Sequence, residues 1–329
     1  MLNHHNVRHL LLSALLSACF TIAIIYATFE LPKIIHLVLI KIFPDFGLIP
    51  YKYEELINAM RPYGYAALVV FITIIVIGIL LRKSKFLVSS SIAMNLTLFG
   101  YFAGTMFVFA GLGILRLVWL PLVDMAIIRL GDVCLLPLFL FLIILYSIGY
   151  PRIHAVFFKV IHTSANIIMI LGVLIIFVSV ATWLYGKFRG VKLVDFGIYE
   201  YIRHPQYLGF IVYSYGLLLA AIMIPFPRGG YFPAPTLPWL LAFMTIITAA
   251  LFEEISLMKT MGDTYKAYME RTHFMIPLPK FIKKVILLPI RLLFKKNYPE
   301  RRIEVLVVIL LYTILLILLS IPFTSLKLR

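Results

Sequence analysis

Two short polar segments in the C-terminal half of the chain hold residue types that can bind a charged ligand. The first contains Arg203 and His204 directly before Pro205, a residue favoured in the first turn of a helix. A helix N-terminus attracts anions, and an arginine adds charge-assisted donors. The second contains Glu253 and Glu254 beside an apolar run, where two carboxylates are costly unless they meet a cation. Together they predict a pocket with an anion-binding half and a cation-binding half. Such a pocket suits a zwitterionic amino-acid moiety, a phosphate or a lipid head group.

The composition of the chain indicates that most of it lies in lipid. Of its 329 residues, 63% are hydrophobic and 13% are charged, and the mean hydropathy is +1.03. Backbone groups cannot stay unpaired in hydrocarbon, and the apolar runs are continuous rather than alternating, so the spanning segments are expected to be helices. The net charge of +16 gathers at the ends of apolar runs. Anionic lipid head groups, and not nucleic acid, are therefore the expected partners.

The apolar runs predict an all-α, polytopic transmembrane helix bundle of about seven to nine spans, since several of the runs reach the ~20 residues that cross a bilayer. Leu31–Pro50 is apolar but broken by prolines, so an interfacial segment and a short extra hairpin both remain open. The candidate spans are Leu10–Phe29, Tyr63–Leu81, Phe86–Leu115, Val133–Tyr150, Ile161–Tyr185, Tyr207–Ile224, Trp239–Phe252 and Ile303–Pro322. The sixth and seventh of these form a hairpin that joins the two polar segments, so the segments can meet in space.

The distribution of basic residues predicts that both polar segments, and with them the catalytic region, lie on the cytoplasmic side of the membrane. Lysines and arginines precede the hairpin and follow it, whereas its connecting loop holds only Arg228. Farther upstream, Arg82, Lys83 and Lys85 also favour the cytoplasm, although three predicted crossings separate them from Lys187. Either one span is re-entrant or the stretch 86–130 crosses twice.

The segment Lys280–Lys296 is both basic and apolar, and it precedes the last predicted span. This composition favours a helix that lies on a membrane surface. The alternative is a short buried helix kinked at Pro289.

The order and spacing of several motifs resemble one family of membrane enzymes. The pattern G-x-Y-x-x-x-R-H-P-x-Y-x-G begins at Gly197, E-E-x-x-L begins at Glu253, G-x-x-Y-x-x-Y begins at Gly262, and an Ile-Pro pair follows at Ile276. This series is similar to the isoprenylcysteine carboxyl methyltransferases, and phospholipid methyltransferases share a looser version. The resemblance covers about Ile167 to Pro279. It implies a methyltransferase core at 160–279, an additional N-terminal transmembrane region at 1–159, and a basic interfacial segment with a final helix at 280–329.

The resemblance implies S-adenosylmethionine as cofactor, bound without a Rossmann domain, and a multi-pass integral membrane enzyme. Two positions would serve catalysis: Arg203 would orient an acceptor carboxylate, and Glu253 would act as base for an amine acceptor. No metal is implied. The cofactor-binding positions would be Tyr199, His204, Pro205, Tyr207 and Glu254.

The expected activity is methyl transfer to a lipophilic acceptor, either an isoprenylcysteine-like carboxylate or a lipid head group. Two other functions compete. An NADPH-dependent membrane reductase of the sterol reductase type shares an Arg-His-Pro-x-Tyr element, but the Glu253–Glu254 pair with Leu257 and the scarcity of basic residues for an extra phosphate favour the methyltransferase. The third possibility is a non-catalytic membrane protein that retains the fold.

Overall fold

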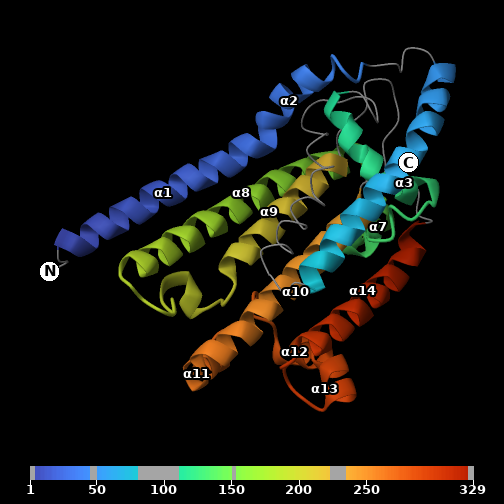
Figure 1. Ribbon diagram of the computed structural model, residues 1–329. Coiled ribbons are helices and arrows are strands. Elements are labelled where there is room, and N and C mark those ends of the chain that lie inside the picture. The colour runs from blue at the N-terminus through green and yellow to red at the C-terminus, as the bar shows by residue number, and fades with distance from the viewer. Residues whose placement is uncertain (1–3, 45–49, 81–110, 150–152, 223–234, 325–329) are drawn as a thin grey trace. The chain divides into compact units, whose positions relative to one another are not determined.

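A computed structural model describes residues 4–44, 50–80, 111–149, 153–222 and 235–324 (Figure 1). Within these ranges the regular structure consists of α-helices and short 3₁₀-helices. The strand-like pairing found there is one isolated bridge between Ile202 and His273. The predicted all-α fold is therefore confirmed for this part of the chain.

Six helical segments of the described residues are apolar and long enough to cross a membrane. Many large side chains along them stay exposed, for example Leu15 at 62% and Leu310 at 61%. Exposed apolar surface of this extent is stable when the surrounding solvent is lipid, so the helices indicate a membrane protein. The six are Asn6–Leu39, made of α1 (His4–Phe29) and α2 (Leu31–Leu39), then Ile57–Gly78 in α3 (Pro50–Leu80), Val156–Phe188 in α8 (Ile153–Phe188), α9 (Pro205–Ile222), α10 (Thr236–Met261) and α14 (Arg302–Thr324).

Two of the eight predicted spans are not among these six helices of the described residues. The run Val133–Tyr150 forms the 3₁₀-helix η2 (Asp132–Leu135) and then α7 (Leu136–Ser147), whose 12 residues are fewer than a straight crossing needs. Gly149 adopts a φ of +60° just after α7, a conformation that ends the helix. Most of the predicted span Phe86–Leu115 lies outside the described residues.

The chain divides into two compact units, which are interleaved in sequence. Unit 1 contains residues 1–25, 168–214 and 247–311, and unit 2 contains residues 26–167, 215–246 and 312–329. The predicted boundary at 159/160 remains a prediction, and α8 runs through it without a break.

Unit 2 has an apolar core centred on Trp119, Leu122 and Leu237, which come from η1 (Gly111–Trp119), α6 (Leu120–Asp124) and α10. Polar contacts accompany it: the Thr236 hydroxyl donates to Asp132 Oδ1 at 2.6 Å, and Arg129 pairs with the same carboxylate at 2.7 Å. Buried charge of this kind is stable because it is paired and hydrogen-bonded.

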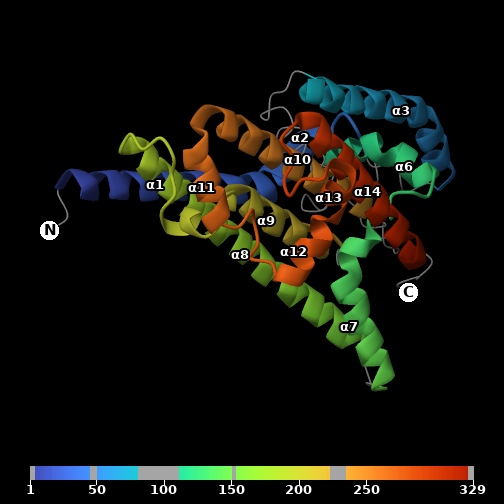
Figure 2. The same cartoon turned by 90° about the horizontal axis from the view of Figure 1, so that it is seen from below.

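Unit 1 contains the predicted polar segments, on helices that pack closely. Within this unit α8 and α9 lie side by side (Figures 1 and 2), and Gly172 and Gly209 face each other's helix. A Cβ added at Gly209 would lie 2.7 Å from Ile176 Cγ1 and 2.9 Å from the Ile176 backbone nitrogen. Small residues at this crossing let the two backbones approach, as is common between helices in lipid.

The basic segment at 280–296 forms two short helices, α12 (Lys280–Ile286) and α13 (Leu288–Phe294), which adjoin each other (Figure 2). The two helices are separated at Leu287, the residue before α13, and Pro289 lies in the first turn of α13. Phe281 is 76% exposed and Leu292 is 72% exposed, whereas Ile290 is buried. The segment is therefore kinked as the alternative supposed, but most of its apolar side chains are exposed, as expected of a membrane-surface segment.

Replacing Gly209 with valine is expected to lower the stability of unit 1 by about 1–3 kcal/mol, because the new side chain would overlap Ile176 backbone atoms. Thermal unfolding of the detergent-solubilised protein measures the effect. The control is Ile170→Phe, which adds volume at a site on α8 that is 59% exposed. Equal melting temperatures for the two variants would contradict the close packing.

Candidate functional site

The start of α9 is fixed by backbone pairing with the chain that follows α11 (Asp263–Arg271). The Arg203 N–H donates to the His273 carbonyl at 2.9 Å, and the His273 N–H donates to the Tyr201 carbonyl at 3.0 Å. The His204 N–H reaches the Phe274 carbonyl at 3.3 Å. Pro205 then begins α9, where its missing N–H costs nothing. This short parallel pairing sets the direction in which the Arg203 and His204 side chains leave the backbone.

Arg203 is held by three hydrogen bonds from its guanidinium group. Nε donates to Glu254 Oε1 at 2.5 Å, and Nη1 donates to the carbonyls of Met269 and Thr272 at 2.9 and 2.8 Å. The side chains of Arg203 and Glu254 are only 7% and 0% exposed, so this is a buried ion pair. The two carbonyls lie at the C-terminal end of α11, where a cation is favourable. Arg203 thus joins α9, α10 and α11, and the prediction that it also orients an acceptor carboxylate remains a prediction.

His204 lies beside the same carboxylate and is surrounded by aromatic rings. Its Nε2 is 3.1 Å from Glu254 Oε1. The Tyr207 ring stacks on it at 5.7 Å between centroids, and Phe274 meets it edge-on at 5.2 Å. Because Arg203 already donates to Oε1, this single oxygen accepts from two side chains.

The other carboxylate oxygen of Glu254, Oε2, is buried and has no hydrogen-bond partner among the described residues. An unmet buried acceptor is costly, about 1–3 kcal/mol or more when charged. Unsatisfied groups of this kind are uncommon in proteins and call for an explanation such as a bound ligand or water.

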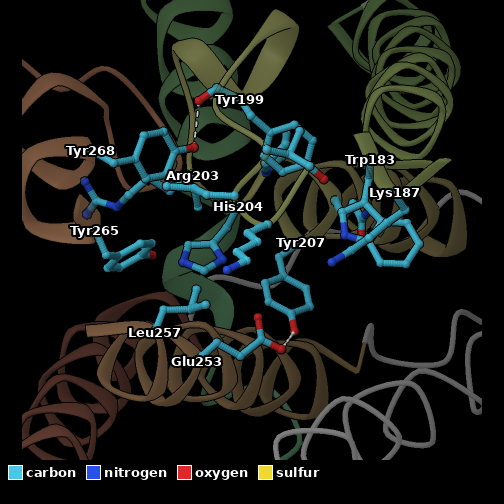
Figure 3. Close-up of a pocket in the computed structure, with 15 residues that line it drawn as sticks. Trp183, Lys187, Tyr199, Arg203, His204, Tyr207, Glu253, Leu257, Tyr265 and Tyr268 are labelled. Carbon is cyan, nitrogen blue, oxygen red and sulfur yellow. Dashed lines mark hydrogen bonds between the residues drawn. The ribbon is translucent and has the colours of Figure 1, made fainter. Parts of the chain in front are cut away.

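Glu253 and Glu254 point in different directions, since neighbouring residues on a helix lie about 100° apart. Glu253 lines a cavity and accepts a hydrogen bond from the Tyr207 hydroxyl at 2.6 Å (Figure 3). Glu254 does not line that cavity and lies behind its wall, where it contacts the lining residues Arg203 and His204. One carboxylate is therefore available to a ligand, while the other holds the wall together.

Three tyrosines complete the wall nearest α11. The Tyr268 hydroxyl donates to the Tyr199 carbonyl at 2.7 Å (Figure 3), and Tyr265 is 1% exposed. Burial raises the pKa of Tyr268 to about 12 and raises the pKa of Tyr199 and Tyr265 as well. All three phenols are therefore neutral hydrogen-bond donors at physiological pH. Tyr265 and Tyr268, the two tyrosines of the G-x-x-Y-x-x-Y pattern, are buried and also line the cavity.

The cavity has a volume of about 340 Å³ and lies within unit 1. Six of the seven predicted site residues line it, and Glu254 is directly behind. The sequence-based prediction missed Trp183 and Lys187 at the end of α8 (Figure 3) and Lys192 in the turn that follows. Trp183 and Lys187 lie one helical turn apart, a spacing that places them on one face. The lining residues are Trp183, Lys187, Lys192, Leu193, Val194, Tyr199, Arg203, His204, Pro205, Gln206, Tyr207, Glu253, Leu257, Tyr265 and Tyr268.

Comparisons with known proteins identify no family for this chain. No protein-family model matches it, and neither the curated proteins nor the solved structures gave a match. The residues of the cavity are therefore the only guide to what this chain binds among the features described above.

Removing one partner of the Arg203–Glu254 pair is expected to destabilise the protein by about 3–5 kcal/mol, because the other charge stays buried and unpaired. Arg203→Met and Glu254→Met should each show this loss, while the double variant should lose less than the sum. Equilibrium unfolding of the three variants in detergent micelles measures the coupling. As a control, the exposed pair Lys266 and Asp263 should contribute at most about 1 kcal/mol. Additive losses at Arg203 and Glu254 would count against the buried pair.

Tyr268→Phe is expected to cost about 1 kcal/mol at neutral pH, because the hydrogen bond to the Tyr199 carbonyl is lost. The folded protein retains the Tyr268 proton up to a pKa of about 12, whereas the unfolded chain loses it near 10.0. The free energy of unfolding should therefore fall as pH rises through this window, and less steeply in the variant. Unfolding midpoints from pH 9 to 12 test this, with the 66% exposed Tyr201→Phe as control. Identical slopes for the wild type and Tyr268→Phe would contradict it.

Proposed function

We propose that this protein is a membrane-embedded methyltransferase that uses S-adenosylmethionine and a lipophilic acceptor, with its active site in the cavity of unit 1. The observation that carries the proposal is that six residues predicted as parts of one site line one cavity together: Tyr199, Arg203, His204, Pro205, Tyr207 and Glu253. Its volume of about 340 Å³ is within the range of small-molecule sites. The cytoplasmic placement of the site and the motif resemblance belong to the same proposal.

The chemistry of the lining suits the amino-acid part of this cofactor. Glu253 offers a carboxylate for an ammonium group, and Tyr207 fixes that carboxylate by its 2.6 Å hydrogen bond. His204 and the first turn of α9, with Pro205 and its following N–H groups, suit a carboxylate.

Aromatic residues supply the remaining surface. Tyr199, Tyr207 and Trp183 line the cavity and offer flat faces for an adenine ring or for cation–π contact with a sulfonium. When bound, S-adenosylmethionine would supply a methyl group whose bond to sulfur breaks as the bond to the acceptor nucleophile forms, the electron pair remaining on sulfur. The protein's part is to hold the two reactants in line and to exclude water.

Arg203 has a supporting part in this proposal. Three of its N–H groups bond within the protein, so its main effect is to position His204 and α10. An acceptor carboxylate would have to approach its Nη2 side. Glu253 remains the candidate base if the acceptor is an amine, which must lose a proton during transfer.

One observation keeps the NADPH-dependent reductase as a second candidate. Lys187 and Lys192 line the cavity and increase its positive charge, which would suit the phosphates of a dinucleotide. NADPH is roughly twice the size of S-adenosylmethionine, however, and the cavity volume of about 340 Å³ suits the smaller ligand.

Binding of radiolabelled S-adenosylmethionine to the purified full-length protein tests the proposal. Saturable binding is expected, and Glu253→Gln should weaken it about tenfold or more, because a charge-assisted hydrogen bond is lost. Glu200→Gln is the matched control, since Glu200 is exposed on the 3₁₀-helix η3 (Gly197–Glu200) and is not part of the cavity. A folded sample that binds NADPH but not S-adenosylmethionine would overturn the proposal in favour of the reductase.

A further inference from the structure

The wall of the cavity formed by α8 differs in charge from the rest. Lys187 lies in the last turn of α8, Lys192 in the turn that follows, and both line the cavity. Neither forms a salt bridge with a carboxylate of the described residues. The nearby Asp195 pairs instead with Arg271, and Glu253 is hydrogen-bonded by Tyr207.

The charges around the cavity leave an excess of positive charge. Three cations, Lys187, Lys192 and Arg203, face the cavity, against the carboxylates of Glu253 and, behind the wall, Glu254. The Arg203 charge is neutralised by Glu254, so the surplus lies at the two lysines. S-adenosylmethionine itself carries one net positive charge. A complex with this cofactor alone would place like charges together, and an anionic second ligand would remove the repulsion.

The position of Lys187 indicates where such an anion comes from. Lys187 is the penultimate residue of an apolar helix long enough to span the membrane, and its ammonium lies 5.6 Å from the centre of the Trp183 ring. Tryptophan and lysine at the end of a span lie at the level of the lipid head groups. Trp183 is 41% exposed, so this wall borders both the cavity and the surroundings of the helix.

We propose that Lys187 and Lys192 form an anion subsite that receives the phosphate of a lipid head group, and that this subsite selects phospholipids whose head group carries a net negative charge as the acceptors of the enzyme. The role of the lipid as methyl acceptor rests on the proposed function, whereas the binding of a lipid at this subsite does not. Lysine suits phosphate binding because its ammonium is a point charge on a flexible chain, so it can pair with a phosphate in several geometries. Trp183 flanks the head group from the apolar side.

The test is equilibrium binding by native mass spectrometry of the full-length protein in a non-ionic detergent. The probes are dihexanoyl phosphatidic acid, dihexanoyl phosphatidylcholine and inorganic phosphate. The wild type is expected to bind phosphatidic acid about tenfold more tightly than phosphatidylcholine. The double variant Lys187→Met/Lys192→Met should lose this preference, whereas Lys259→Met/Lys266→Met, which changes two lysines outside the cavity, should keep it.

The three probes and the two double variants distinguish the possible outcomes. Inorganic phosphate that competes as well as phosphatidic acid would keep the anion subsite but overturn the lipid as its source. Equal binding of the two lipids, or a preference that survives in the double cavity variant, would overturn the subsite. The affinity for S-adenosylmethionine is measured on the same samples: a loss confined to the cofactor in the double variant would assign the lysines to the cofactor and overturn the inference. If no sample binds the cofactor, the proposed function fails, and the lipid arm still decides the subsite.

Discussion

The buried carboxylate of Glu254 is the constraint on which unit 1 depends. It is fully buried on α10, and moving such a charge out of water costs several kcal/mol. Arg203 compensates by a 2.5 Å hydrogen bond, and the same guanidinium bonds two carbonyls at the end of α11. The start of α9, the C-terminal half of α10 and the end of α11 therefore meet at one pair of charges, although Arg203 is 51 residues from Glu254 in sequence. Any rearrangement of α9, α10 or α11 must break this contact.

A buried ion pair is a poor choice if stability were the sole requirement. Apolar residues of similar volume often stabilise a core as well or better than a buried pair. Here the pair leaves one carboxylate oxygen of Glu254 unmet and holds His204, on which the Tyr207 ring stacks, beside the other oxygen. The pair thus fixes the orientation of a cavity-lining residue, and this links the architecture of unit 1 to the shape of its cavity.

The sequence predicted the elements that carry the site because their signals are local. Pro205 after a polar pair predicts a helix start, and long apolar runs predict α8, α9 and α10, which the structure confirms. The predicted span Val133–Tyr150 stays a prediction, because an apolar run says little about where a helix begins and ends. The Thr236 hydroxyl donates to Asp132 at the start of this segment, and Gly149 takes a positive φ at its end. The first of these is a tertiary contact that composition does not encode.

The orientation of side chains could not be read from the sequence in the same way. Glu253 and Glu254 are chemically identical neighbours, and the rotation of α10 decides which one meets the cavity. Lys187 was missed because a lysine at the end of a span is usually a membrane anchor. Its role as a lining residue depends on the turn at Gly190, with φ of +70°, which directs the chain back past the end of α8.

The charge pattern of the cavity distinguishes between the two cofactors more sharply than its volume. A dinucleotide phosphate brings only negative charge to its binding groups, and Glu253 would repel it over part of the wall. A sulfonium amino acid carries an ammonium for that carboxylate and a carboxylate for the first turn of α9. It leaves Lys187 and Lys192 for a third charged group. The placement of Glu253 on α10 and of the two lysines at the end of α8 therefore supports the proposed pair of ligands, a cationic cofactor and an anionic lipid.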